Sequence, residues 1–308
     1  MYPMTSFAMV PAAELIGPTG AGKSSFIEAI HSRSTRAPLK ISGDTLEGVT
    51  QQVTIYRAYG VSDKRHGPNV PIYIIDTPGF MDPKISELQV IKAIKEWRDR
   101  CNALKGYVRV LYFHPITDVR LAASKVICMQ LLKDFWGEYN MATVTLVTTM
   151  WDPDSLPLGK RAAAKERFDK LKKCQLEWAD WCRKGSQTAK FENTFESAME
   201  ILNRAVTLTV EFDPHRNRHP ADDVLQLADA LLGQRISSLQ EQLGNLDNGL
   251  LDLSLNEEDK LFFMQKREET QSTWKRFKNQ QGNLRKQRKK AKLAASSTHE
   301  QQTNKTFL

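Results

Sequence analysis

Short apolar runs alternate with amphipathic stretches from the start of the chain to about Pro214. The runs are strand-sized and rich in β-branched and aromatic residues, whereas the stretches between them place apolar side chains at helical spacing. The predicted strands are a segment ending at Ile16, Gln52–Tyr59, Ile72–Ile75, Tyr107–Phe113 and Thr143–Thr149. The predicted helices start near Lys23, Ile85, Val119, Gly159 and Thr194, the fourth running to Lys184. This order predicts an α/β fold, a three-layer sandwich with a mostly parallel sheet.

The pattern changes after a segment rich in Pro, His, Arg and Asp at Phe212–Asp223, which we interpret as a linker. Beyond it, Leu and Ile recur at steps of three, four or seven residues, which predicts a helix with one apolar face. That face either packs on its own domain or forms a coiled coil with a partner, and Gly244 and Gly249 weaken the helix by about 1 kcal/mol each. The stripe consists of Leu225, Leu232, Ile236, Leu239, Leu243, Leu246, Leu250 and Leu253.

These patterns divide the chain into a body (1–215), a helical extension (216–255) and a basic, largely disordered tail (256–308). The net charge of +8 belongs to the tail, because Lys260–Lys292 contains twelve Lys/Arg and two Glu. The basic segment is a solvated surface, a contact with an anionic membrane, or a contact with nucleic acid. The sequence leaves these three interpretations open, and it gives no reason to expect nucleic-acid binding by the body.

Bulk composition sets the remaining limits. Apolar residues make up 41% of the chain, enough for a packed core. No apolar run approaches the roughly 20 residues that a membrane-spanning helix needs, and the start of the chain lacks the pattern of a secretory signal. Four scattered cysteines are typical of free thiols in a reducing compartment. We therefore expect a cytoplasmic protein, with a nuclear location and peripheral membrane attachment through the tail as the alternatives.

The strongest chemical signal is a glycine-rich loop between the first predicted strand and the first predicted helix. Glycines allow tight turns that expose consecutive amides, and these amides and the helix N-terminus bind phosphate oxygens. Lys23 is expected to reach the β- and γ-phosphates, and the Ser24 hydroxyl to ligate Mg²⁺. Pro11 and Glu14 make the preceding strand unusual, since a central strand is normally apolar and uses every amide. The predicted phosphate site is Gly17, Pro18, Thr19, Gly20, Ala21, Gly22, Lys23, Ser24 and Ser25.

A second motif follows the apolar strand Ile72–Ile75 and reads Asp76-Thr77-Pro78-Gly79. A strand-end carboxylate such as that of Asp76 can hold Mg²⁺, and the amide of Gly79 can donate to a γ-phosphate. Such a turn changes shape when that phosphate is lost.

A third motif, Thr149-Met150-Trp151-Asp152, follows the strand that ends at Thr149. The carboxylate of Asp152 can accept from both N1–H and the 2-amino group of guanine, and adenine offers no such pair of donors. The alternative is a strand-end Asp that caps a turn. Met150 stands where a Lys usually packs on the base, and the question is whether a Met stem can do the same without relaxing guanine specificity.

These motifs, in this order, resemble the septin-like and AIG1/Toc-type branch of the P-loop GTPases, over roughly residues 8–210. With Tyr112–Asp118 upstream, the base motif looks like a group of fungal G-domain-containing proteins. The resemblance implies GTP and GDP as ligands, Mg²⁺ as cofactor, and Thr50 as the switch threonine that ligates the metal, with Thr45 as alternate. It also implies a base contact from the Phe191-Glu192-Asn193 segment, which makes Asn193 a candidate.

Turnover is the open point of this interpretation. Ras-like GTPases orient the attacking water with a Gln, and Phe80 stands at that position here. We expect slow hydrolysis, supported by Lys23 and Thr50 and completed by dimerisation across the nucleotide face. His114 can approach the phosphates or a partner, or it can be a buried structural residue. A scaffold in which GTP only gates assembly through the helical extension, and an ATPase using the same loop, are the other hypotheses.

Overall fold

The computed structural model describes residues 11–33, 39, 41, 52–60, 71–82, 84–100, 108–119, 123–173, 177–207, 221–251 and 256–305. The chain forms two compact units. The first comprises Met1–Ile85 and Gln89–Arg218, and the second comprises Ser86–Leu88 and His219–Leu308.

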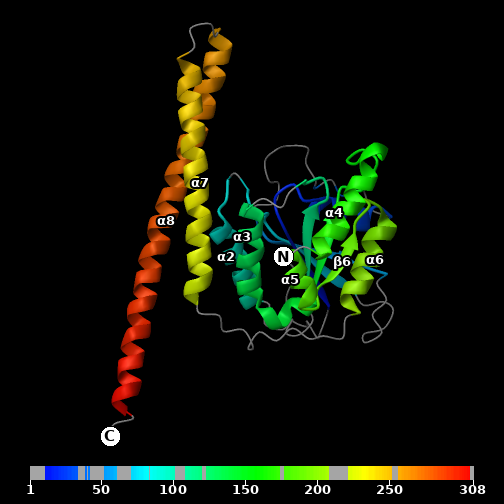
Figure 1. The fold of residues 1–308 in the computed structure, drawn as a ribbon, viewed down its shortest axis with the longest axis horizontal. Coiled ribbons are helices and arrows are strands. Elements are labelled where there is room, and N and C mark those ends of the chain that lie inside the picture. The colour runs from blue at the N-terminus through cyan, green and yellow to red at the C-terminus, as the bar shows by residue number, and fades with distance from the viewer. Residues whose placement is uncertain are drawn as a thin grey trace. The chain divides into compact units, whose positions relative to one another are not determined.

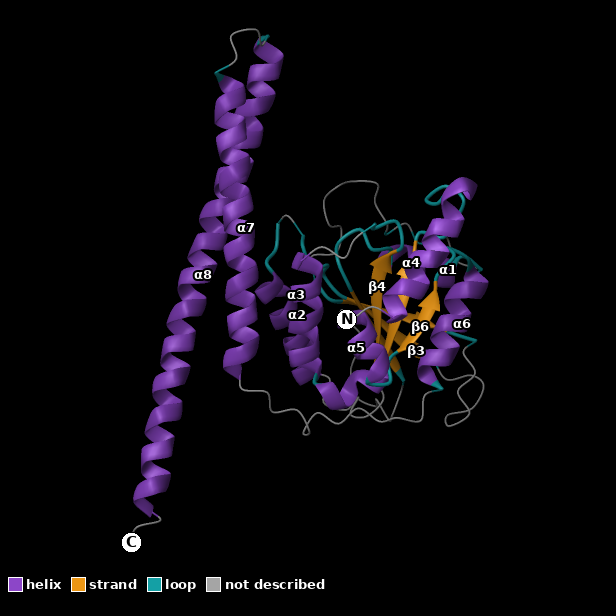
Figure 2. Ribbon diagram, viewed as in Figure 1, coloured by secondary structure: helices purple, strands orange, loops and turns teal. Residues whose placement is uncertain are grey.

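The first unit is built on a six-stranded sheet in the order β2-β3-β1-β4-β5-β6, drawn as orange arrows in Figure 2. Only β2 runs antiparallel, to β3, and the other neighbours are parallel. The predicted mostly parallel α/β sandwich is therefore confirmed. The strands are β1 (Ala12–Ile16), β2 (Thr54–Ala58), β3 (Ile72–Asp76), β4 (Val108–Pro115), β5 (Val144–Thr149) and β6 (Gln187–Lys190).

The unusual first strand lies in the middle of the sheet. β1 pairs with both β3 and β4, and all five of its residues are buried, Glu14 included. Pro11 precedes the strand and its carbonyl accepts a hydrogen bond from the amide of Tyr73, N···O 3.1 Å. The amide that Pro11 lacks is thus not needed for the ladder, and the strand is short but central.

Helices cover both faces of this sheet (Figure 1). Alternate residues of β4 show the two layers: Leu111 and Phe113 join the cluster formed with α1 and α6, whereas the rings of Tyr112 and His114 contact Trp181 and Trp178 of α5. The helices are α1 (Lys23–His31), α2 (Glu87–Arg100), α3 (Ala123–Trp136), α4 (Arg161–Lys173), α5 (Glu177–Arg183) and α6 (Phe195–Val206), with short 3-10 turns η2 (Glu138–Thr143) and η3 (Leu158–Lys160).

Two local predictions differ from the structure. The single helix predicted over Gly159–Lys184 is replaced by η3, α4 and α5. Strand β6 is absent from the predicted strands, because Gln187–Lys190 has no apolar alternation. Its strand character comes from its pairing with the buried strand β5.

The second unit contains the antiparallel helices α7 (Ala221–Leu250) and α8 (Glu257–Lys305), yellow and orange-red in Figure 1. Leu232 and Ile236 of the predicted stripe are buried with Phe277 and Leu284 of α8. Asp229 pairs with Arg285, and Phe263 packs so closely on Gly249 that an added Cβ would lie 2.6 Å from its ring. The apolar face predicted in the helical extension is therefore covered in part by the same chain.

The tail differs from its prediction, since the structure has helix α8 where 256–308 was expected to be largely disordered. Its Lys, Arg, Gln and Glu residues have good helix propensity despite their polarity, and α7 supplies an apolar surface for the few buried side chains. Within the described residues, no helix has the length and apolar character needed to cross a bilayer.

Candidate functional site

The glycine-rich loop connects β1 to α1, as the sequence predicts. Gly17, Gly20 and Gly22 all have positive φ, at 151°, 74° and 86°, a region that side chains rarely adopt. A Cβ on Gly17 would lie 2.6 Å from the carbonyl oxygen of Phe113 in β4. Gly22 is the N-cap of α1, whose first turn contains no acidic residue. The loop thus leads into a helix N-terminus that favours an anion.

Lys23 places a cation inside this loop. Its Nζ donates to the carbonyl oxygens of Gly17 at 3.2 Å and Pro18 at 3.0 Å, and only 7% of the residue is exposed. Burial lowers the pKa of Lys23 to about 8, although Asp76 and Asp82 act to raise it. A nearly buried ammonium group beside backbone donors fits a polyphosphate chain.

The acidic motif lies directly beside the loop. Asp76 ends β3 opposite Leu15 of β1, and it is buried. Thr77 anchors the turn, because its hydroxyl donates to the Leu15 carbonyl at 2.6 Å. Gly79 approaches the phosphate loop so closely that a Cβ there would lie 2.6 Å from the backbone nitrogen of Thr19. Glycine is required at position 79 by this contact between two backbones.

The structure describes two of the three predicted magnesium ligands, and their role as ligands stays a prediction. Ser24, in the first turn of α1, and Asp76 supply a hydroxyl and a carboxylate, the oxygen ligands that Mg²⁺ prefers. Thr50 and its alternate Thr45 lie outside the described residues. Across the described part of the chain, no group of three or more His, Cys, Asp or Glu side chains could hold a metal by itself. Such a site would therefore depend on phosphate oxygens and water as further ligands, as is usual for Mg²⁺.

The base motif adjoins the phosphate loop from the other side. Thr149 ends β5, and a Cβ on Gly22 would lie 3.4 Å from Thr149 Cβ. The Thr149 hydroxyl is buried and has no hydrogen-bond partner among the described residues. A buried hydroxyl of this kind is expected to have a partner, and a bound base is one candidate.

Asp152 follows as a half-buried residue and also caps a turn. Its Oδ1 accepts from the amide of Ser155 at 2.9 Å, so the structural alternative raised by the sequence is present. Each carboxylate oxygen can accept more than one hydrogen bond, so capping leaves Asp152 able to accept from a base. Met150 has φ 62°, and its Sδ accepts from the Thr117 hydroxyl at 3.2 Å.

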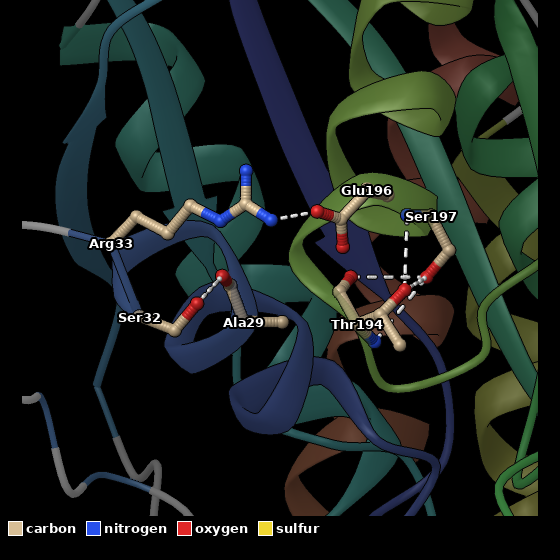
Figure 3. A network of polar contacts seen from close by, with 6 residues as sticks. All are labelled: Ala29, Ser32, Arg33, Thr194, Glu196 and Ser197. Atoms are coloured by element: carbon tan, nitrogen blue, oxygen red, sulfur yellow. Dashed lines mark hydrogen bonds and ion pairs between the residues drawn. The ribbon is translucent and has the colours of Figure 1, made fainter.

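Asn193 belongs to the loop between β6 and α6. The amide of Phe191 donates to the Thr148 carbonyl at 2.8 Å, which ties this loop to the end of β5, and Asn193 itself is exposed with φ 58°. Thr194 and Ser197 form a capping box at the start of α6. Figure 3 shows this box beside an ion pair between Arg33, after α1, and Glu196 in α6. The start of α6 is thus linked to the end of α1 by an exposed ion pair.

His114 lies away from this arrangement. Its ring packs edge-on against Trp178 at 5.5 Å, on the face of β4 opposite Phe113, and it is 2% exposed. Burial lowers its pKa to about 4, against the effect of Asp118. These contacts are those of a buried structural histidine, which is one of the two interpretations that the sequence leaves open.

One contact that sequence reasoning missed joins the two phosphate-side loops. Asp82 is buried, and its Oδ2 accepts from the Thr19 hydroxyl at 3.4 Å. The only sequence signal for this contact is that Asp82 comes soon after the Asp-x-x-Gly motif and that Asp side chains often accept hydrogen bonds from backbone amides in turns.

Comparison with known proteins agrees with this geometry. Residues 13–128 match the family described as 50S ribosome-binding GTPase. Over these residues the chain is therefore similar to the G domain of P-loop GTPases. No curated protein matches the chain. The finer resemblance to septin-like and fungal proteins stays a prediction.

Solved structures with a similar fold are distant. A dimerization-deficient mutant of Toc33 from Arabidopsis thaliana is 17% identical with a TM-score of 0.44, covering 66% of this chain and 87% of its own. Toc33 with Mg²⁺ and GMPPNP is 18% identical with a TM-score of 0.44, covering 65% and 83%. NFeoB from S. thermophilus, bound to GDP·AlF4⁻ and K⁺, is 14% identical with a TM-score of 0.37, covering 86% and 92%. Likeness of this degree carries no argument about what the present chain binds.

Proposed function

We propose that this chain binds GTP and GDP together with Mg²⁺ and acts as a GTP-dependent switch with slow or partner-assisted hydrolysis. The observation that supports this best is the buried ammonium group of Lys23 in a loop of positive-φ glycines between β1 and α1. Asp76 adjoins that loop, and both lie in the part of the chain that matches the GTPase family. In this proposal Ser24, Asp76 and Thr50 ligate the metal, which when bound neutralises phosphate charge.

Guanine is the proposed base because of Asp152. The carboxylate is half-buried and follows β5, and its acceptor atoms complement the two donors of guanine. Thr149 adds a buried hydroxyl next to Gly22. Asn193 completes the proposed base site from the loop before α6.

Slow turnover is proposed because Phe80 stands where Ras-like enzymes have a water-orienting Gln. The side chain of Phe80 is fully buried and has no polar atom to orient a nucleophile. The same observation favours a second candidate, a scaffold in which GTP gates assembly without turnover. We also propose that two copies of the chain associate across the nucleotide face or along α7. The segment Lys260–Lys292 is proposed to contact an anionic membrane or nucleic acid, and the proposed location is the cytoplasm.

The test is nucleotide binding and turnover by the purified full chain. A fluorescent GTP analogue should bind saturably with Mg²⁺, and GTP and GDP should displace it far better than ATP. Single-turnover assays should then show phosphate release from GTP that is slow and rises with protein concentration. Binding without any release would select the scaffold, and better displacement by ATP than by GTP would contradict the proposed base site.

A further inference from the structure

The loop that follows β3 is joined to the phosphate loop by a short backbone bridge. The amide of Thr19 donates to the Phe80 carbonyl at 2.8 Å, and the amide of Phe80 donates to the Gly17 carbonyl at 3.1 Å. These bonds form an isolated parallel bridge between Pro18 and Phe80. Phe80 is fully buried, and Met81 next to it has φ 59°. The two loops thus form a defined, closed arrangement.

Asp82 extends this bridge with its side chain. Its Oδ1 accepts from the amides of Lys84 at 2.7 Å and Ile85 at 3.3 Å, and its Oδ2 accepts from the Thr19 hydroxyl. Only 1% of Asp82 is exposed. One buried carboxylate therefore holds the turn ahead of α2 and the tip of the phosphate loop together.

We propose that Thr19 and Asp82 determine the preference between diphosphate and triphosphate, and that their contact favours the diphosphate. This inference rests on the proposed nucleotide binding and assigns two further residues to that site. Thr19 and Asp82 act as specificity-determining residues through the position of the loop Asp76–Asp82.

The first reason is space. A γ-phosphate that accepts from the Gly79 amide needs room beside Gly79, and the closed bridge holds this glycine so near the phosphate loop that a Cβ on it would lie 2.6 Å from the Thr19 nitrogen. The bridge must therefore open before this contact can form. A diphosphate needs only the amides around Gly20–Ser24 and the Lys23 ammonium group, so it binds with the bridge closed. The free energy needed to open the bridge therefore lowers the affinity for the triphosphate but does not lower the affinity for the diphosphate.

The second reason is charge. The carboxylate of Asp82 lies against the loop that holds the Lys23 ammonium group, because Asp82 accepts from the Thr19 hydroxyl while the Lys23 Nζ donates to the Gly17 and Pro18 carbonyls. A γ-phosphate adds negative charge close to the same ammonium group, and two anions in a buried place repel each other. This repulsion also acts against the triphosphate more than against the diphosphate.

The experiment compares the affinities of the full chain for GDP and for the non-hydrolysable GMPPNP, both with Mg²⁺. Thr19→Val removes the hydroxyl at nearly constant volume, and Asp82→Asn keeps an oxygen for the amides of Lys84 and Ile85 while removing the charge. In each variant the ratio Kd(GMPPNP)/Kd(GDP) should fall by about five- to tenfold, because Thr19→Val removes the hydrogen bond and Asp82→Asn removes the negative charge that strengthens it and that repels a γ-phosphate. Thr19→Ser keeps the hydroxyl and should leave the ratio unchanged. In the double variant Thr19→Val/Asp82→Asn, the ratio should fall by much less than the product of the two single decreases, because both substitutions affect the same contact.

The outcomes separate the inference from the proposed function. If the wild type binds neither nucleotide, the proposed function fails. If the wild type binds both, but the ratio in Thr19→Val and Asp82→Asn is unchanged or rises, the inference is wrong while nucleotide binding stands. Thermal unfolding of each variant without nucleotide checks the fold, and saturable binding of GDP shows that the phosphate loop still forms, while the ratio of the two affinities remains the quantity that tests the inference.

Discussion

The phosphate end and the base end of the candidate site are built in different ways. At the phosphate end the backbone sets the shape: a Cβ on Gly17 would meet the backbone of Phe113, and a Cβ on Gly79 would meet the backbone of Thr19. At the base end, the side chains at the end of β5 set the shape. Asp152 caps a turn there, and Met150 contacts Thr117.

This difference predicts unequal tolerance to change. Few sequences can form a loop whose shape depends on close backbone contacts, because a side chain at such a glycine would clash with the backbone of a neighbouring segment. At the base end, one hydrogen-bond acceptor or one apolar side chain can be replaced by another, and the protein then loses only part of its affinity for the nucleotide. Substitutions at the two ends test this contrast.

The largest effect is expected for Lys23→Ala. The variant removes the one ammonium group that donates to the Gly17 and Pro18 carbonyls and that is proposed to reach the phosphates. Affinity for GTP should fall by about 100-fold or more, since a buried charge-assisted contact is lost. Equilibrium titration with a fluorescent GTP analogue measures it, and Lys190→Ala, which removes a cation over the Trp151 ring instead, is the control. Equal losses in both variants would contradict the role of Lys23.

Gly17→Ala tests the backbone basis of the phosphate end without any ligand. The added methyl would meet the Phe113 carbonyl at 2.6 Å, and φ is 151°. We expect a loss of about 2–3 kcal/mol in the free energy of unfolding, measured by urea denaturation. Gly20→Ala is the matched control: it also has positive φ, at 74°, but nothing lies within 4 Å, so a loss of about 1 kcal/mol is expected. Similar losses would mean that contact with β4 does not shape the loop.

The same contrast explains how much the sequence could predict. The glycine-rich loop between β1 and α1 and the turn Asp76–Gly79 after β3 could be placed because glycine spacing after a strand is local information. Five of the six strands could be predicted because they are apolar or rich in β-branched and aromatic residues. The Thr19–Asp82 contact joins residues 63 positions apart, and local patterns do not contain such pairings. The polar strand β6 and the helix α8 were missed for a related reason, since each depends on a neighbouring element.

Asp152→Asn tests the base end. Asn keeps the oxygen that accepts from the Ser155 amide but replaces an acceptor by a donor, so GTP binding should weaken by about 1.5–3 kcal/mol. Xanthosine triphosphate, whose 2-oxo group accepts a hydrogen bond, should bind the variant better than it binds the wild type. Competition assays with both nucleotides measure this, and unchanged GTP affinity would remove Asp152 from the site.

Met150→Lys should have the smallest effect. The Met stem and a Lys stem offer similar apolar contact to a base, so the added ammonium group should strengthen GTP binding by less than about 1 kcal/mol. The loss of the contact between Met150 Sδ and the Thr117 hydroxyl opposes even that gain, because the thioether is only a weak acceptor. Met150→Leu, which keeps an apolar stem, is the control and should bind GTP within about twofold of wild type. A gain of tenfold or more in Met150→Lys would show that a charge at this position matters more than apolar packing, and the base end would then be as demanding of its residues as the phosphate end.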